Sequence, residues 1–321
     1  MDITSSLDFQ SRSAAALFGS AAAGLLLTTL VSAVLGRAAA GGRPQLMAGA
    51  MVRRVNAAWL MLAAVALAMV VGQAALVLLF AFVSLHALHE LLTLVPHRRA
   101  DRAAIVVAYF GVLPLQYLLV WKGWYGLFAV AIPVFAMVLL PVLSALAGDT
   151  QRYLERQTQL QWGLMISVYC VSHLPALAML QLPGFEGRQL LLLVFVVVVV
   201  LGGGLLQSLC GQFFGRHPLP ATLASGTSWE GMLGGWVGGT LLGTALHGIT
   251  PFTAAQAAAL SALLCGVGFL GGLVLTAIKR DRGIQHWGRR FDGHRGMLDR
   301  LGPLVFAAPV FFHLVRGIWA S

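Results

Sequence analysis

Charged residues are scarce in this chain: of its 321 residues only 10% are Asp, Glu, Lys or Arg, against about 25% in soluble globular proteins. Hydrophobic residues make up 59%, and the mean hydropathy is +0.84. This composition excludes an ordinary soluble domain and indicates a polytopic membrane protein. The three cysteines lie in apolar segments, so we expect neither a disulfide framework nor a cysteine-rich zinc site.

Acidic residues are the scarcer of the two signs, with 11 Asp and Glu against 21 Lys and Arg and a net charge of +10. The basic residues are spread over many loops, which indicates attraction to anionic lipid headgroups and not a nucleic-acid surface. We therefore expect no nucleic-acid partner. The first residues, MDITSSLDFQSR, are acidic where a secretory signal is basic, so the first apolar run is predicted to be a retained helix.

Long apolar segments dominate the rest of the chain and predict an all-α, polytopic integral membrane protein with about ten transmembrane helices, since about 20 apolar residues span a bilayer. The second and third segments are separated only by Gly72 and are interpreted as a tight hairpin. The predicted segments are 15–35, 57–71, 73–94, 104–121, 124–146, 161–181, 188–208, 230–247, 254–278 and 301–318.

The Lys and Arg residues are distributed unevenly between the two sets of loops. The loops after odd-numbered segments hold 17 of the 21 basic residues, all but Arg12, Lys122, Arg188 and Arg316. Positively charged loops stay in the cytoplasm. The loop 279–300 is therefore predicted to face the cytoplasm, provided that the hairpin at Gly72 is correct.

This loop, KRDRGIQHWGRRFDGHRGMLDR, has the composition of an anion-binding segment. It carries seven basic and three acidic residues, a local excess of +4. Arg and Lys bind the phosphates of a nucleotide or a lipid, and His294 is suited to donate to a phosphate oxygen or to act as a general acid or base. An ordinary positive loop is the alternative, but it would not need the Trp, the His residues and the four glycines found here.

Two further groups of residues have simpler explanations. The glycines of segment 230–247 repeat at small-xxx-small spacing and predict close helix packing, not a nucleotide-binding loop. His86 and Glu90 share a helical face and are interpreted as a paired interior cluster, although Glu90 remains a candidate because it is ionisable within a membrane segment. His173 and His247 look isolated and are assigned no role.

The C-terminal part resembles bacterial phosphatidate cytidylyltransferases, also called CDP-diacylglycerol synthases. Their signature reads S-x-x-K-R-x4-K-D-x-G-x2-L/F-P-x-H-G-G-x-x-D-R-x-D, and this chain resembles it without a gap. The segments GQFFGRHPL and GTSWEGMLGG resemble two further motifs of the family. The matching signature positions are Thr276, Lys279, Arg280, Gly288, Phe291, His294, Gly296, Asp299 and Arg300.

The resemblance implies the reaction of CTP with phosphatidate to give CDP-diacylglycerol and pyrophosphate, with Mg²⁺ as cofactor if the protein is active. It implies a single membrane domain, 1–321, with N-terminal scaffold helices in 1–185 and signature-bearing helices in 186–321. It also implies a bacterial inner membrane, with phosphatidate or another anionic phospholipid as partner, CTP if active, and a homodimer as one open possibility. The implied roles are catalytic for Asp299 and His294, substrate-binding for Lys279, Arg280, Arg300, Trp229 and Glu230, and metal-binding for Asp299. Asp281 lies nearby at a variable position of the signature and is a further candidate metal ligand. For Glu230, a role as an N-terminal helix carboxylate is equally open.

The departures from the family pattern remove mainly carboxylates. Gly203 and Gly204 stand at an Asn-Asp pair, Gly272 at an Asp, Gln285 and His286 at a Lys-Asp pair, Gly302 at the last Asp, Thr227 at a Lys and Arg295 at a Gly. Loss of several metal ligands predicts impaired or lost catalysis, and the glycines are expected to let helices pack closely. Two alternatives remain: an active enzyme whose metals are held by Asp281, Asp292, Asp299 and Glu230, and a non-catalytic lipid-binding, partner or transport protein.

Overall fold

The computed structural model describes residues 71–94, 98–220, 227–284 and 296–320, together with Ala63, Leu67, Ala68 and Trp287. The chain forms two compact units, Met1–Leu76 and Val77–Ser321. The second unit contains nearly all of the described residues and is the one considered below. Its regular elements are helices, apart from an isolated antiparallel bridge between Pro218 and Ser228.

Seven of the described helices are long and apolar enough to cross a membrane, which confirms the all-α membrane fold. An eighth helix, α11 (Trp229–Ala245), has 17 residues and is apolar and rich in glycine. Each predicted segment from 73–94 onward corresponds to one of these eight helices. Segment 15–35 and nearly all of 57–71 lie outside the described residues, so the count of ten stays a prediction. The spans are Gln73–Leu92, Arg99–Lys122, Tyr125–Leu146, Tyr153–Met179, Leu190–Phe214, Ala254–Asp281 and Met297–Trp319.

Three of these spans are composite, because a π-helical stretch interrupts the α-helix. The labelled pieces are α3 Gln73–Leu92, α4 Arg102–Val107, α5 Leu113–Lys122, α6 Tyr125–Val130, α7 Met137–Leu146, α8 Tyr153–Leu164, α9 Val171–Met179, α10 Leu190–Phe214, α11 Trp229–Ala245, α12 Ala254–Asp281 and α13 Met297–Trp319. The π-helical stretches are Ala108–Val112, Ala131–Ala136 and Met165–Cys170. Short 3₁₀ turns precede α4 at Arg99–Asp101 and follow α11 at His247–Ile249.

Proline residues inside the spans free backbone carbonyls, and side chains of neighbouring helices bond to them. A proline lacks the N–H that would bond the carbonyl four residues earlier. For Pro133 this carbonyl belongs to Ala129, which accepts from the Tyr169 hydroxyl at 3.2 Å. For Pro141 it belongs to Met137, which accepts from Gln161 Nε2 at 3.0 Å. The prolines are therefore tolerated because polar side chains replace the lost bonds.

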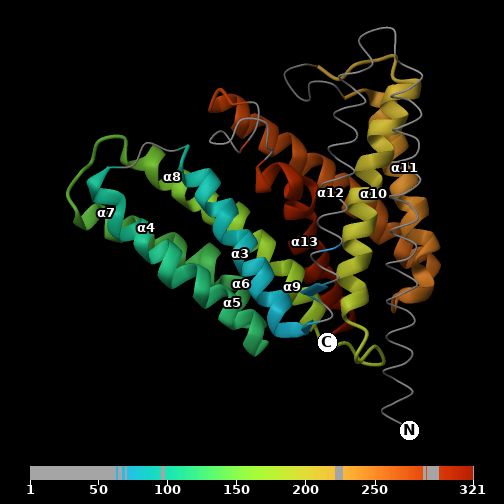
Figure 1. Ribbon diagram of the computed structural model, residues 1–321, viewed down its shortest axis with the longest axis horizontal. Helices are drawn as coiled ribbons and strands as arrows, with labels where there is room; N and C mark the ends of the chain where they lie inside the picture. The colour runs from blue at the N-terminus through green and yellow to red at the C-terminus, as the bar shows by residue number, and fades with distance from the viewer. Residues whose placement is uncertain are drawn as a thin grey trace. The chain divides into compact units, whose positions relative to one another are not determined.

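The helices α10 and α11 run side by side and antiparallel (Figure 1). Gly231, Gly235, Gly239 and Gly243 recur every fourth residue on the buried face of α11. A Cβ atom on Gly235 would lie 2.8 Å from the carbonyl oxygen of Gly203 on α10. No larger side chain fits there without moving the backbone, so the predicted small-residue packing of this segment is confirmed.

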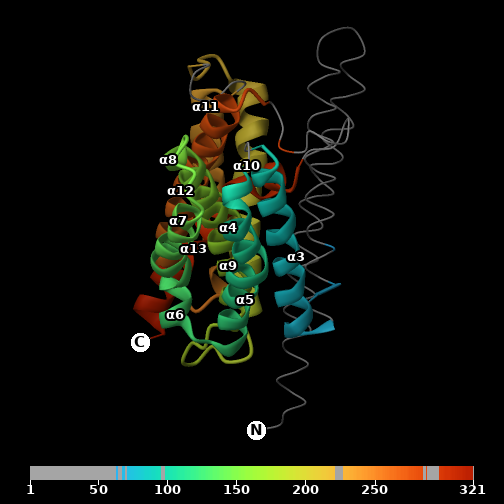
Figure 2. The ribbon, with the colours of Figure 1, turned by 90° about the vertical axis from the view of Figure 1, so that its left-hand side faces the viewer.

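The helix α13 lies against α12, α10 and α9. Figure 1 shows α4 to α9 as a second group of helices on the left, and Figure 2 shows this group in front of α10, α12 and α13. Figure 1 places the turn between α7 and α8, the end of α10 and the end of α12 toward one end of the helices, and the end of α13 toward the other. The described residues that border three of the predicted basic loops thus lie at one end.

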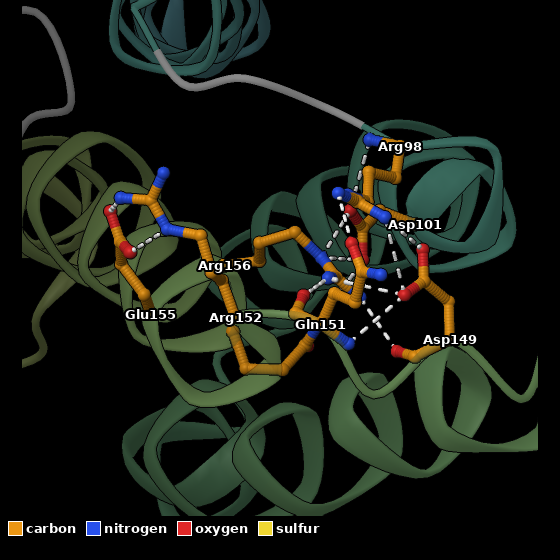
Figure 3. Close-up of polar contacts among 8 residues, drawn as sticks. Arg98, Asp101, Asp149, Gln151, Arg152, Glu155 and Arg156 are labelled. Carbon is orange, nitrogen blue, oxygen red and sulfur yellow. Dashed lines mark hydrogen bonds and ion pairs between the residues drawn. The ribbon is translucent and has the colours of Figure 1, made fainter.

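A buried ion pair joins the start of α4 to α8 at this end (Figure 3). Arg156 bonds Asp101 at 2.9 Å, and both side chains are only 5% exposed. The Arg156 guanidinium also donates to the carbonyl oxygens of Gln151 and Asp149, while Arg98 bonds the Asp149 carboxylate at 3.1 Å. The backbone amide of Gln151 and the Arg98 guanidinium hold the pKa of Asp149 below its usual range. Arg156 of α8 therefore joins the start of α4 to the loop that contains Asp149 and Gln151.

Replacing Asp101 by Ala should destabilise the protein strongly, because the buried Arg156 would lose its counter-charge. Breaking one partner of a buried pair costs about 3–5 kcal/mol. The matched control is Arg152→Ala, which removes an exposed arginine paired with Glu155 at 2.7 Å and should cost about 1 kcal/mol or less. Thermal unfolding of the detergent-solubilised variants compares the two. Equal losses of stability would contradict a structural role for the buried pair.

Candidate functional site

The C-terminal end of α12 stops at a left-handed glycine that turns the chain into the loop. Gly283 has φ +64°, the Gly283 amide bonds the Arg280 carbonyl at 3.0 Å, and the Ile284 amide bonds the Lys279 carbonyl at 2.9 Å. This pair of backbone hydrogen bonds is a Schellman cap, which requires a residue that tolerates positive φ. The cap fixes the end of α12, so it determines the position of Lys279 in the last turn and the residue at which the loop begins.

Lys279 and Asp299, 20 residues apart in the chain, form an ion pair in the loop. The Lys279 ammonium lies 2.9 Å from Asp299 Oδ1, and the two side chains are 20% and 7% exposed. The other oxygen of Asp299 accepts from the backbone amide of Trp287 at 3.0 Å. The structure thus brings together two of the predicted site residues and adds Trp287, whose side chain is 2% exposed. Sequence reasoning had assigned this tryptophan no role.

Glu90 of α3 holds the first turn of α13. Its two carboxylate oxygens accept from the backbone amides of Met297 and Leu298 at 2.7 and 3.1 Å. These are the first amides of the helix, which have no partner within it, and a negative charge there is favoured by the helix dipole. Asp299 is the next residue. Glu90 therefore sets the position of the turn that carries Asp299 and Arg300.

The interpretation of His86 and Glu90 as a paired interior cluster is wrong. His86 is exposed, and its ring packs edge-on against Phe82 with centroids 4.3 Å apart, while Glu90 bonds α13. The spacing of four placed both residues on one face but could not reveal that the N-terminus of a helix more than 200 residues later would meet only one of them. The signal that did point to Glu90 was an ionisable side chain in an apolar helix.

A second polar cluster lies where α10 ends and α11 begins. The amide of Trp229 bonds the His217 carbonyl at 3.0 Å and the amide of Leu219 bonds the Thr227 carbonyl at 2.9 Å, which closes the turn. Glu230 accepts from the ring of His217 at 2.6 Å. Glu230 thus pairs with a histidine that sequence reasoning had not singled out.

The other predicted site residues have a less definite setting. Arg280 is exposed at the end of α12, Arg300 is half-buried in the first turn of α13, and Trp229 is 48% exposed. Asp281 is 72% exposed and bonds Arg282 at 3.3 Å. His294 lies outside the described residues, as do Gln285, His286, Asp292 and Arg295.

The carboxylates of the described loop residues do not fit a Mg²⁺ site. Mg²⁺ needs oxygen ligands in a near-octahedral arrangement. Both oxygens of Asp299 already accept from nitrogen donors, and Asp281 is turned to the surface. In the part of the chain that the structure describes, no group of three His, Cys, Asp or Glu side chains gathers around a common point.

Comparison with known proteins identifies the family. The model of the cytidylyltransferase family matches residues 52–318, which is most of the chain. The chain belongs to the cytidylyltransferase family. An uncharacterised Escherichia coli protein, YnbB, is 34% identical over 213 residues, which cover 65% of this chain and 70% of that protein.

Relatives with an assigned activity match over a shorter region. The phosphatidate cytidylyltransferase of Mycobacterium leprae is 40% identical over 104 residues, 31% of this chain and 32% of its own length. That of Aquifex aeolicus is 34% identical over 103 residues, 32% of this chain and 38% of its own length. The chain therefore matches about a third of the length of these enzymes.

The glycines at positions where the sequence comparison predicts Asn (Gly203) or Asp (Gly204, Gly272 and Gly302) have two different settings. A Cβ on Gly203 would lie 3.0 Å from Cys265 Sγ and 3.3 Å from the carbonyl oxygen of Gly235, so this position belongs to the tight α10–α11 contact. A Cβ on Gly204 or Gly272 would meet nothing within 4 Å, and one on Gly302 would make an ordinary 3.5 Å contact with Leu275. The expectation that these glycines allow close helix packing is right for Gly203 and wrong for Gly204 and Gly272.

Removing the Glu90 carboxylate should loosen the first turn of α13. Substitution of a side chain that caps a helix N-terminus costs about 0.5–2 kcal/mol. Glu90→Ala should therefore speed hydrogen–deuterium exchange of the Met297 and Leu298 amides, measured by mass spectrometry on the protein in detergent. The control Glu186→Ala removes an exposed glutamate that bonds only the nearby Gly184 amide among its described contacts. Unchanged exchange in Glu90→Ala would contradict the capping role.

Proposed function

We propose that this protein is a phosphatidate cytidylyltransferase-like protein of the bacterial inner membrane that binds phosphate esters at its cytoplasmic loop and has impaired or lost catalysis. The single observation that carries the proposal is the pairing of Asp299 with Lys279 at 2.9 Å. The one carboxylate kept at a signature position is balanced by a lysine. The loop therefore retains basic residues that can bind phosphate, while the carboxylate of Asp299 is already paired with Lys279.

The anion-binding half of the proposal rests on the charges and donors of the loop. Lys279, Arg280, Arg282 and Arg300 belong to the end of α12, its cap and the first turn of α13. Trp287 adds a buried indole N–H that has no hydrogen-bond partner among the described residues. An unpaired buried donor costs about 1–3 kcal/mol, and a phosphate or carbonyl oxygen of a ligand would satisfy it. The expected ligands are phosphatidate, or another anionic phospholipid, and CTP.

The proposal of impaired catalysis rests on the contacts of the carboxylates. Phosphoryl transfer depends on positioning and on metals that neutralise developing charge. Each acidic residue in the described part of the chain has a nitrogen partner within it: Glu90, Asp101, Asp149, Glu155, Glu186, Glu230, Asp281 and Asp299. A partner does not exclude a metal, but a metal pair would need several of these contacts to break at once.

The two alternatives are supported less well. An active enzyme with metals on Asp281, Asp299 and Glu230 would need Asp281 to turn inward and Glu230 to leave His217. Transport would be expected to use polar groups at the membrane midplane, whereas most basic residues of this chain lie in one set of loops.

The direct test measures binding and turnover separately on the full-length protein purified in detergent. With CTP, phosphatidate and Mg²⁺, we expect saturable binding of phosphatidate or CTP and little formation of CDP-diacylglycerol. Lys279→Ala should weaken binding at least tenfold, because it removes a cation from the loop and leaves Asp299 uncompensated. Lys122→Ala is a matched control, since Lys122 is the other lysine of the chain and lies at the end of α5. Robust formation of CDP-diacylglycerol by the wild type would contradict the proposal of impaired catalysis.

Restoring carboxylates at the open glycine positions tests descent from an active enzyme. The variant with Gly204→Asp, Gly272→Asp, His286→Asp and Gly302→Asp should fold, because a Cβ atom at the three glycines makes no contact shorter than 3.5 Å, and it should gain Mg²⁺-dependent CTP turnover. Gly203→Asp is the packing control: it should destabilise the protein, since its side chain would press on Cys265 and on the backbone of Gly235. Equal stability of the Gly203→Asp and Gly204→Asp variants would contradict the assignment of open and closed positions.

A further inference from the structure

Two histidines meet in the half of the helices away from the cytoplasmic loop. His173 lies six residues before the end of α9, and His313 lies six residues before the end of α13. At a rise of about 1.5 Å per residue both are roughly 9 Å inside the helix ends. The expectation that His173 is isolated is therefore wrong. Ionisable side chains at such depth are costly and are functional candidates by default.

The donor atoms of this cluster are arranged like ligands of one ion. His173 Nε2 and His313 Nε2 are 3.3 Å apart, and the Tyr169 hydroxyl oxygen lies 3.4 Å from His313 Nε2. Two nitrogens bound to one tetrahedral metal at about 2.0–2.1 Å are separated by about 3.3–3.4 Å. The separation of the two imidazoles thus matches the edge of a tetrahedral site.

The hydrogen bonds of His173 fix the tautomer that a metal ligand requires. Its Nδ1 lies 2.7 Å from the backbone carbonyl oxygen of Tyr169, so Nδ1 carries the proton and donates it. Nε2 then presents a lone pair toward His313. Metal-binding histidines commonly donate their second nitrogen to a backbone carbonyl in this way, which sets the ring orientation.

Aromatic packing holds His173 rigidly, while His313 stays reachable. The ring of His173 is fully buried, with the rings of Phe128 and Phe312 at centroid distances of 4.6 and 5.1 Å. His313 is exposed. The Tyr169 hydroxyl lies 3.2 Å from the Ala129 carbonyl, the group freed by Pro133. His173 is therefore pre-positioned inside the protein, while His313 lies at the surface of this unit.

We propose that His173 and His313, with the Tyr169 hydroxyl beside them, bind a transition-metal dication of the Zn²⁺ class. Imidazole nitrogen suits Zn²⁺, Cu²⁺ and Ni²⁺, whereas Mg²⁺ prefers oxygen ligands. Water would complete the coordination from the exposed side. Arg316, three residues beyond His313, lies over the ring of Tyr125 at 5.4 Å, and its positive charge should lower the affinity for any dication. The site is independent of the proposed function.

The alternative is a plain hydrogen bond, in which His313 Nε2–H donates to His173 Nε2. This arrangement needs no ion and accounts for the same distance. Only a binding measurement separates the two, because both keep the rings in place.

The test uses full-length protein purified in detergent through a tag without histidine, and Zn²⁺ alone as probe. Equilibrium dialysis with elemental analysis should show saturable binding of one Zn²⁺ per chain that excess Mg²⁺ does not displace. His313→Ala should weaken binding at least tenfold. His247→Ala should leave it unchanged, because that exposed histidine bonds the carbonyl of Thr244 and lies outside the cluster. Co²⁺ bound in place of Zn²⁺ should give the visible absorption of a tetrahedral site.

The possible outcomes decide the proposal. His313→Gln serves as a second variant if His313→Ala does not fold, as judged by size-exclusion chromatography, since Gln keeps a hydrogen-bonding group at this position. No saturable Zn²⁺ binding by the wild type would show that the pair is a hydrogen bond between imidazoles only. Equal binding by the wild type and the His313 variant would place the ion elsewhere and would likewise overturn the proposal.

Discussion

The first turn of α13 is the junction on which the candidate site depends. Its leading amides donate to Glu90 of α3, and its third residue, Asp299, pairs with Lys279 of α12. One turn of helix therefore joins a scaffold helix to the two helices that carry the family signature. Negative charge is favourable at a helix N-terminus, so two carboxylates stabilise this turn. Without Glu90, nothing described here would fix the turn relative to α3.

The scarcity of acidic residues gives each of them a defined task. Asp101 neutralises the buried Arg156, Asp299 neutralises Lys279, and Glu230 accepts from His217. A buried charge is tolerated only when a partner balances it. In a chain with so few carboxylates, one that holds a metal ion would have to give up a contact that stabilises the fold. This relation connects the low acid content of the sequence to the proposed loss of catalysis.

The glycines at 203, 204 and 272 lie in two different structural settings. At Gly203 the missing side chain is the condition for the contact between α10 and α11, as it is along the face formed by Gly235 and Gly239. At Gly204 and Gly272 there is space for a side chain. An ancestral carboxylate at these two positions would have been lost without any gain in packing. Relief from the cost of a charge within the membrane accounts for such a loss.

The sequence by itself determined the membrane class, the eight described helices, the glycine packing and the concentration of cations in the loop, because hydropathy, residue size and charge are local properties. It also predicted Lys279 and Asp299 as site residues through their match to the family signature. Only the tertiary structure decided what they contact. The cap by Glu90, the turn of Asp281 to the surface and the meeting of His173 with His313 depend on contacts between residues far apart in the chain. Such contacts are set by how whole helices pack, and no local pattern encodes them.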